Sequence, residues 1–173
     1  MGDGSTIIAG LAIPSTDLLF LSLVALHIAF ALVCVIAGPI AMLSWKGPGR
    51  HPSAGTIYFW SLAGVCASAA ILSATRWGED FHLFILGTLA FSAAYIGRHA
   101  KRRRWNGWVR VHIAAMGSSY ILLLSAFYVD NGKQLPLWRD LPPWTYWTAP
   151  AIVGLPIIAW ALLRHRLVQT PSR

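Results

Sequence analysis

Residues 110–129, RVHIAAMGSSYILLLSAFYV, form a run that is long and apolar enough to cross a membrane as a helix, since a span needs roughly 20 mostly apolar residues. Its first half nevertheless carries His112, Met116, Ser119 and Tyr120. An ionisable side chain inside a span is costly, and it usually faces the interior of the protein. The stretch therefore predicts a transmembrane helix with one polar face turned towards neighbouring helices.

The composition of the whole chain points the same way. Of its 173 residues, 56% are hydrophobic and only 12% are charged, and the mean hydropathy is +0.57. A soluble domain of this length leaves too much of its area exposed to hide so much apolar surface. Only helices or closed barrels satisfy their backbones in lipid, and runs this long and continuously apolar are typical of helices. Five stretches qualify as spans: residues 18–43, 57–74, 78–96, 108–129 and 144–163.

The predicted fold is therefore all-α, an integral membrane bundle of five transmembrane helices that forms a single domain over residues 1–173. Its orientation follows from the distribution of charge. Eleven of the 14 Lys and Arg residues fall on one side of such a chain: Lys46, Arg50, Arg98, Lys101, Arg102, Arg103, Arg104, Arg110, Arg164, Arg166 and Arg173. All six acids fall on the other side: Asp3, Asp17, Glu79, Asp80, Asp130 and Asp140. Because basic connections stay in the cytoplasm, we expect the N-terminus outside and the C-terminus in the cytoplasm of a bacterial inner membrane.

Three features of the sequence are read as structural. The basic connection KRRRW at 101–105 is explained by membrane insertion and contact with anionic lipid, so we expect no nucleic-acid partner. Residues 1–17 lack the basic region of a cleavable signal, so the first span is expected to remain as an anchor. Cys34 and Cys66 lie in the middle of two spans, outside any CxxC motif, and are expected to be small packing residues.

The candidate functional residues are four histidines at or inside the spans. His99 and His165 belong to the basic connection and the tail, whereas His27, His51, His82 and His112 accompany the apolar runs. With alternating helix directions, His27 and His82 belong to the outer half of the membrane, and His51 and His112 to the inner half. Two imidazoles from different helices at one depth are the ligands of a bis-histidine haem.

The leading hypothesis is therefore a protein that binds haem b and exchanges electrons with a quinone or a redox partner protein. His51 and His112 would ligate an inner haem, and His27 and His82 an outer one. Met116, Ser119 and Tyr120 share a helical face with His112 and would line the inner pocket. Small residues at 64–70 and at 117–118 would admit the face of a porphyrin.

Two alternatives stay open. The first is a non-enzymatic membrane subunit or small transport component, in which hydrogen bonds from core histidines, serines and tyrosines join the helices. The second is a membrane metal-dependent hydrolase using up to three of the histidines with Asp130, since zinc accepts imidazole and carboxylate ligands. No HExxH motif and no Walker-type glycine loop is present to favour an enzyme of a known class.

Three segments together carry a resemblance: HIAFALVCVIAGP at 27–39, RHPSAGTIYFW at 50–60, and HIAAMGSSYILLLSAFYVDN at 112–131. They resemble a bacterial family of small membrane proteins known as domain of unknown function 2306, over about residues 27–160. The resemblance implies a helical integral membrane protein, with histidines placed much as in small di-haem b-type cytochromes, and it supplies no reaction. Family members often have His-Arg at the start of the second span, whereas here Pro52 follows His51.

Overall fold

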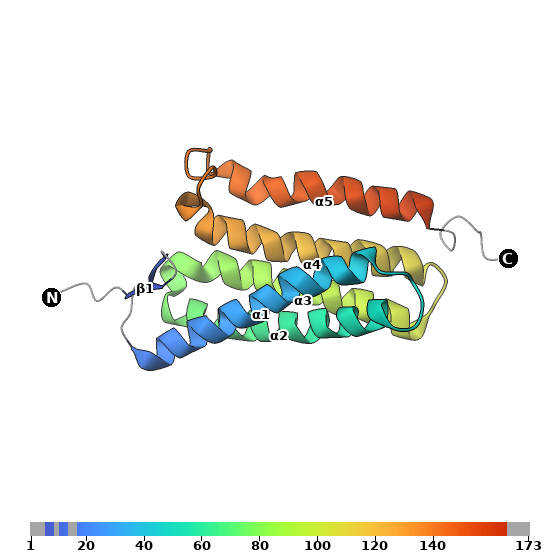
Figure 1. The fold of residues 1–173 in the computed structure, drawn as a ribbon, viewed down its shortest axis with the longest axis horizontal. Helices are drawn as coiled ribbons and strands as arrows, with labels where there is room; N and C mark the ends of the chain where they lie inside the picture. The colour runs from blue at the N-terminus through green and yellow to red at the C-terminus, as the bar shows by residue number, and fades with distance from the viewer. Residues whose placement is uncertain (1–5, 9–10, 14–16, 166–173) are drawn as a thin grey trace. The chain divides into compact units, whose positions relative to one another are not determined.

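The computed structural model describes residues 6–8, 11–13 and 17–165, and the spans predicted above are all helical in it (Figure 1). The five helices are α1 (Leu18–Leu43), α2 (Arg50–Thr75), α3 (Trp77–Arg103), α4 (Trp108–Asn131) and α5 (Trp144–Arg164). Each is long and apolar enough to cross a membrane. Asp3, Arg166 and Arg173, which entered the charge argument, lie outside the described residues.

Two details differ from the predicted all-α spans. Residues before α1 include a short antiparallel pair of strands, β1 (Thr6–Ile8) and β2 (Leu11–Ile13), in which Ile7 faces Ala12. Helix α2 begins at Arg50 and α3 ends at Arg103, seven residues beyond the apolar runs in each case. Both extensions carry basic residues. Because these long polar side chains can reach the head groups, each helix can continue past the hydrocarbon.

The chain divides into two compact units, Met1–Phe84 and Ile85–Arg173, and the division falls within α3. In the first unit α1 and α2 pack against each other as an antiparallel pair. Gly64 of α2 receives the ring of Phe30, since a Cβ atom at residue 64 would lie 2.6 Å from Phe30 Cδ2. One turn nearer the α1–α2 connection, the buried Cys34 thiol lies 3.7 Å from the carbonyl of Tyr58.

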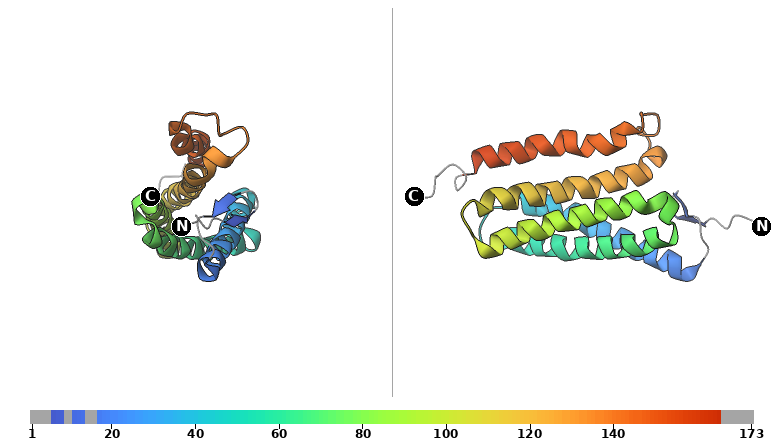
Figure 2. Two further views of the ribbon diagram at one scale, coloured as in Figure 1. Left: turned by 90° about the vertical axis from the view of Figure 1, so that its left-hand side faces the viewer. Right: turned by 180° about the vertical axis from the view of Figure 1, so that it is seen from behind.

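In the second unit α4 and α5 are the main antiparallel pair (Figure 2), and their contact uses two glycines reciprocally. A Cβ atom at Gly117 of α4 would lie 2.6 Å from Ile158 Cγ1, and one at Gly154 of α5 would lie 2.4 Å from Ile121 Cγ1. Each isoleucine thus fills the space left by a glycine on the opposite helix. Such close approach suits helices in lipid, where association depends on van der Waals packing.

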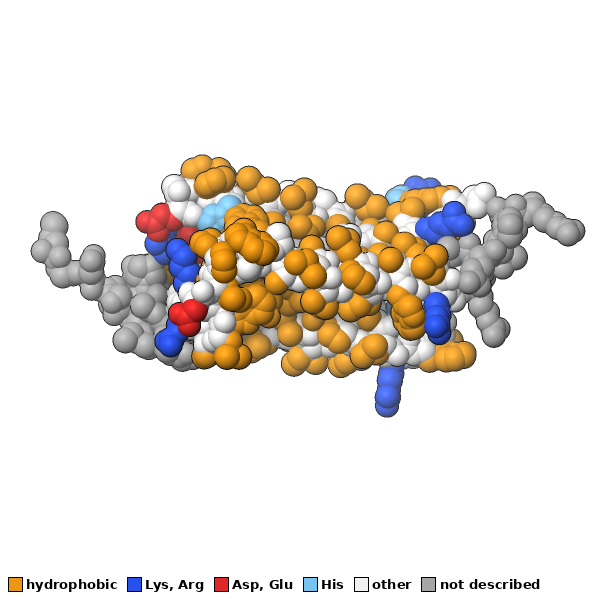
Figure 3. All heavy atoms as spheres, turned by 90° about the horizontal axis from the view of Figure 1, so that it is seen from above, with side chains coloured by type: hydrophobic (Ala, Val, Ile, Leu, Met, Phe, Trp, Pro, Cys, Tyr) orange, Lys and Arg blue, Asp and Glu red, His pale blue; other side chains and the backbone are white. Residues whose placement is uncertain are grey.

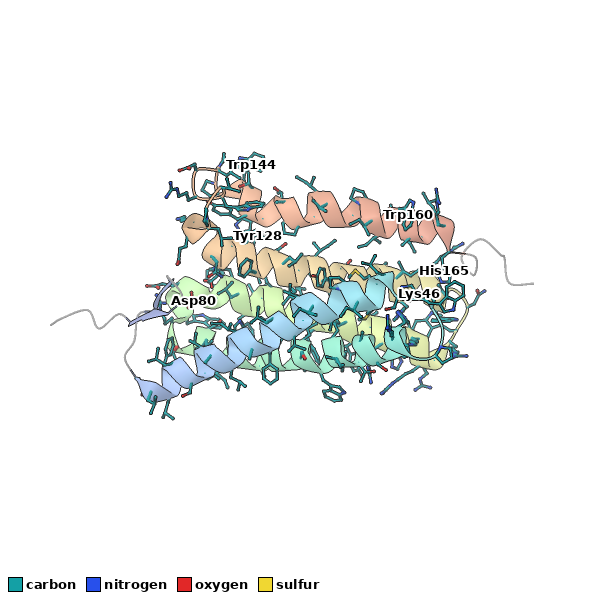
Figure 4. The ribbon with its side chains drawn as sticks, viewed as in Figure 1. Lys46, Asp80, Tyr128, Trp144, Trp160 and His165 are labelled. Atoms are coloured by element: carbon teal, nitrogen blue, oxygen red, sulfur yellow. The ribbon has the colours of Figure 1, made fainter. Side chains whose placement is uncertain are left out.

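The connection from α4 to α5 packs back onto the ends of these helices. The ring of the buried Tyr146 covers Gly132, and its hydroxyl donates to the carbonyls of Trp138, at 3.0 Å, or Leu141, at 3.3 Å. The ring of Trp138 lies 4.4 Å from that of Tyr128, which Figure 4 labels at the end of α4. This contact ties the connection to the last turn of α4.

Charged residues gather at helix ends, whereas hydrophobic side chains cover the middle of the helices on the face that Figure 3 shows. The end of each helix that is nearest residues 44–49, 104–107 or 165 is called its basic end, and the opposite end is called its acidic end. All five described acids lie at acidic ends, where exposed ion pairs join Arg76 to Glu79 and Arg139 to Asp140.

The glycine contacts generate a stability prediction. Gly117→Ala should lower the free energy of unfolding by about 1–3 kcal/mol, because the new methyl group overpacks against Ile158. Gly55→Ala is the matched control, since a Cβ atom there meets nothing within 4 Å. It should be neutral or stabilising by up to about 1 kcal/mol. Unfolding in mixed detergent micelles measures both changes, and equal effects of the two substitutions would contradict the packing described.

Candidate functional site

Three of the four candidate histidines use Nδ1 to contact a neighbouring helix or connection. His51 Nδ1 lies 2.8 Å from the carbonyl oxygen of Ala41, and His112 Nδ1 lies 2.8 Å from that of Gly97. His27 Nδ1 lies 2.9 Å from Ser68 Oγ. The fourth, His82, lies in the second turn of α3, where its ring contacts Phe81 edge to face.

These contacts determine which ring nitrogen carries the proton. A carbonyl oxygen can only accept, so Nδ1 of His51 and of His112 is the donor. The hydroxyl of Ser68 lies 2.7 Å from the carbonyl of Gly64 and 3.0 Å from that of Val65, so it donates within its own helix. Its oxygen therefore accepts from His27 Nδ1. In the neutral form of each of these imidazoles, Nε2 is the nitrogen with the lone pair.

His51 occupies the basic end of the α1–α2 pair. The carbonyl of Ala41 accepts from His51 Nδ1 and also from Nζ of Lys46, at 3.1 Å, so two side chains satisfy a carbonyl in the last turn of α1. Lys46, labelled in Figure 4, lies in the connection itself. The terminal carbonyls of a helix have no partner within the helix, and cationic side chains are favourable there. His51 thus has a structural task at this corner.

His112 lies on the side of α4 that packs against α3, within the second unit. A Cβ atom at Gly97 would lie 2.9 Å from Met116 Cγ and 3.3 Å from Ala115 Cβ, so Met116 packs directly on this glycine. His112 hydrogen-bonds the carbonyl of the same residue. The prediction that His112 and Met116 share an inward face is confirmed.

Ser119 and Tyr120 were predicted to continue that face. Ser119 is completely buried, and its hydroxyl lies 2.8 Å from the carbonyl of Met116 in its own helix. Tyr120 is partly buried. The interior position predicted for Ser119 is confirmed, while its part in lining a ligand pocket stays a prediction.

His27 and His82, the ligand pair predicted for the outer haem, both belong to the first unit. His27 is level with Ser68, which is seven residues before the end of α2 at Thr75. His82 is five residues after the start of α3 at Trp77, and Arg76 alone separates the two helices. At about 1.5 Å per residue, both histidines lie within about two turns of this connection. Their depths along the helices are therefore closer than their positions in the apolar runs suggest.

Two surfaces expected to admit a porphyrin are already occupied. Phe30 fills the space over Gly64, and Ile158 fills the space over Gly117. A flat ligand against either glycine would have to displace a packed side chain from the opposite helix. The histidine donors thus fit a haem in type and tautomer, whereas Gly64 and Gly117 take part in helix packing, and the porphyrin surface predicted at 64–70 and 117–118 stays a prediction.

The zinc alternative finds no support in this geometry. Among the described residues, no group of three or more His, Cys, Asp or Glu side chains is placed to hold a metal ion. Asp130 and all four candidate histidines are among the residues described. A hydrolytic zinc site needs three protein ligands around one ion.

The contacts also reveal partners that sequence reasoning missed. Gly97 had no assigned role, and Ser68 was expected only as one of the small residues at 64–70, yet they receive His112 and His27. In an antiparallel pair, residues equally distant from the connection face each other. That rule, applied to the connections at 44–49 and 104–107, points from His27 to about residue 66 and from His112 to about residue 99, each within one helical turn of the observed partner.

Comparisons of the chain with known protein families, with curated proteins and with solved structures found no match. The resemblance to domain of unknown function 2306 stays a prediction.

The His27–Ser68 contact can be measured as a coupling energy. His27→Phe and Ser68→Ala, made singly and together, should show an interaction of about 0.6 kcal/mol in unfolding experiments in micelles, the average for hydrogen bonds between membrane helices. Ser61→Ala is the matched control, a buried serine two turns away on the same helix. Its coupling to His27→Phe should be close to zero. Equal coupling for both serines would contradict a specific bond.

Proposed function

We propose that this chain is a multi-pass membrane protein that binds haem b through its membrane histidines and exchanges electrons with a quinone or a redox partner protein. One observation supports the proposal above the others: His27, His51 and His112 each donate Nδ1–H to a fixed acceptor. Histidines that ligate metals usually donate the other ring N–H in this way, which fixes the tautomer and the orientation of the ring.

In this proposal His27 and His82, both in the first unit, form the outer ligand pair, and His51 and His112 are the ligands predicted at the inner depth. The protein's own contribution is to fix which ring nitrogen of each imidazole carries the proton and to limit the rotation of the ring. Ser68 does this for His27, the Ala41 carbonyl for His51, and the Gly97 carbonyl for His112. When bound, haem iron would supply one-electron transfer, and two sites at different depths would allow electrons to cross the membrane.

The visible spectrum tests the proposal. Protein purified in mild detergent should show a Soret band and sharp bands after dithionite reduction. His112→Ala should lower the haem content by about half, since a residue that would hold one of the two haems is removed. His99→Ala is the matched control, because His99 stacks on Tyr95 near the basic end of α3 and belongs to neither pair.

Haem content is measured per folded protein, with helicity and gel-filtration volume as checks on folding. A colourless protein that stays colourless after reconstitution with haem would overturn the proposal. Equal loss of haem from His99→Ala and His112→Ala would also count against the assigned ligands.

A second candidate is a non-enzymatic membrane subunit or small transport component. The same three contacts favour it, because each joins neighbouring helical segments and needs no ligand to explain it. The occupied spaces over Gly64 and Gly117 favour it further. In this case the histidine variants would lose stability, with no spectroscopic change.

We further propose an inner-membrane orientation with the N-terminus outside and the C-terminus in the cytoplasm. It is supported by the described basic residues near the connections at 44–49 and 104–107 and at Arg164, against three at acidic ends: Arg76, Lys133 and Arg139. Green fluorescent protein fused after residue 173 should fluoresce, and alkaline phosphatase fused there should be inactive, because each reporter works on one side only. A fusion within residues 132–143 should give the reverse result, and the opposite pattern would invert the orientation.

A further inference from the structure

A cavity of about 660 Å³ opens at the basic end of the α1–α2 pair, within the first unit. This volume lies in the range of small-molecule sites, roughly 300–1,000 Å³. The lining comes from the last turns of α1, the connection and the first residue of α2. It includes the side chains of Pro39, Ile40, Leu43, Trp45, Pro48 and Arg50.

The lining is apolar apart from two residues. Ser44 is the remaining lining residue, and its hydroxyl donates to the carbonyl of Ile40, one turn earlier in α1. Arg50 is the one charged residue of the lining, and it is exposed. The cavity therefore combines a hydrophobic wall with a single guanidinium group.

No acidic side chain in the described part of the chain neutralises the positive charge around Arg50. The sequence contains no Asp or Glu between residues 18 and 78, and Arg50 takes part in no ion pair among the described residues. The neighbouring Lys46 donates to the carbonyls of Ala41 and Met42 at the end of α1. An anion at Arg50 would thus meet two cationic side chains and no carboxylate from this helix pair.

The position of the cavity specifies the rest of the ligand. It lies at the end of a span, where the 90% exposed ring of Trp45 suits the boundary between hydrocarbon and head groups. Ile40 and Leu43 extend the wall towards the hydrocarbon. A ligand that fills this site needs an apolar chain on one side and an anionic oxygen group on the other.

We propose that this cavity binds one anionic phospholipid, with the phosphate at Arg50 and an acyl chain against Ile40 and Leu43. A guanidinium presents paired N–H donors that match phosphate oxygens. A zwitterionic lipid would bring its own ammonium group close to Arg50 and Lys46. The proposal is independent of haem binding, since none of the lining residues is a candidate ligand.

Fluorescence quenching tests the proposal on the intact protein in phosphatidylcholine nanodiscs. Brominated phosphatidylglycerol quenches tryptophans that it contacts, and the difference between the unmodified protein and Trp45→Phe isolates the Trp45 signal from the other eight tryptophans. Half-maximal quenching of Trp45 should need about fivefold less brominated phosphatidylglycerol than brominated phosphatidylcholine, given roughly 1 kcal/mol per basic residue near an anionic surface. An excess of inorganic phosphate should leave the quenching unchanged.

Substitutions then separate the site from general charge. Arg50→Gln should abolish the preference for phosphatidylglycerol, while Arg50→Lys should retain part of it. Arg102→Gln is the matched control, because it removes the same charge from an exposed arginine of α3 and should retain the preference. Equal quenching by the two brominated lipids, or equal loss in Arg50→Gln and Arg102→Gln, would overturn the proposal. Relief of quenching by inorganic phosphate would overturn it in favour of a simple anion site.

Discussion

A hydrogen-bonding group in lipid has no water to bond, and this constraint underlies the arrangement of the helices. The backbone meets it by forming α1 to α5, in which N–H and C=O groups bond within each helix. Polar side chains meet it in two ways. Ser119 bonds back to its own helix, whereas His27 and His112 reach a group on the next helix. The second solution joins elements, so the histidines stabilise helix pairs whatever else they do.

Glycine residues allow neighbouring helices to approach closely where those bonds form. His112 reaches the carbonyl of Gly97 where Met116 packs on the same residue, and His27 bonds Ser68 one turn from the place where Phe30 covers Gly64. A larger residue at Gly64 or Gly97 would force a packed side chain on the neighbouring helix to move. Close packing and polar bonding are therefore parts of one contact, and each supports the other. The Gly117–Ile158 and Ile121–Gly154 contacts apply the same packing rule without a polar partner.

A histidine held through Nδ1 suits two roles at once. It satisfies a polar group at a helix contact, and it keeps Nε2 as the basic nitrogen for a metal or another donor. His51 illustrates the overlap, since its bond to the Ala41 carbonyl completes the end of α1 and also fixes its tautomer. Pro52, which follows His51, is compatible with this structural task because proline is tolerated in the first turn of a helix.

The sequence by itself determined that the chain is helical, how many helices are apolar enough to cross a membrane and roughly where each lies, because the length and hydropathy of each apolar run follow from the order of residues along the chain. It also indicated that His112 and Met116 share a face, since this follows from helical spacing. Only the tertiary structure decided what those faces contact: Gly97 for His112, Ser68 for His27, and Ile158 over the glycine expected to face a porphyrin. The reason is that a small residue leaves space beside a helix, and the sequence does not specify whether a ligand or a side chain of another helix fills that space.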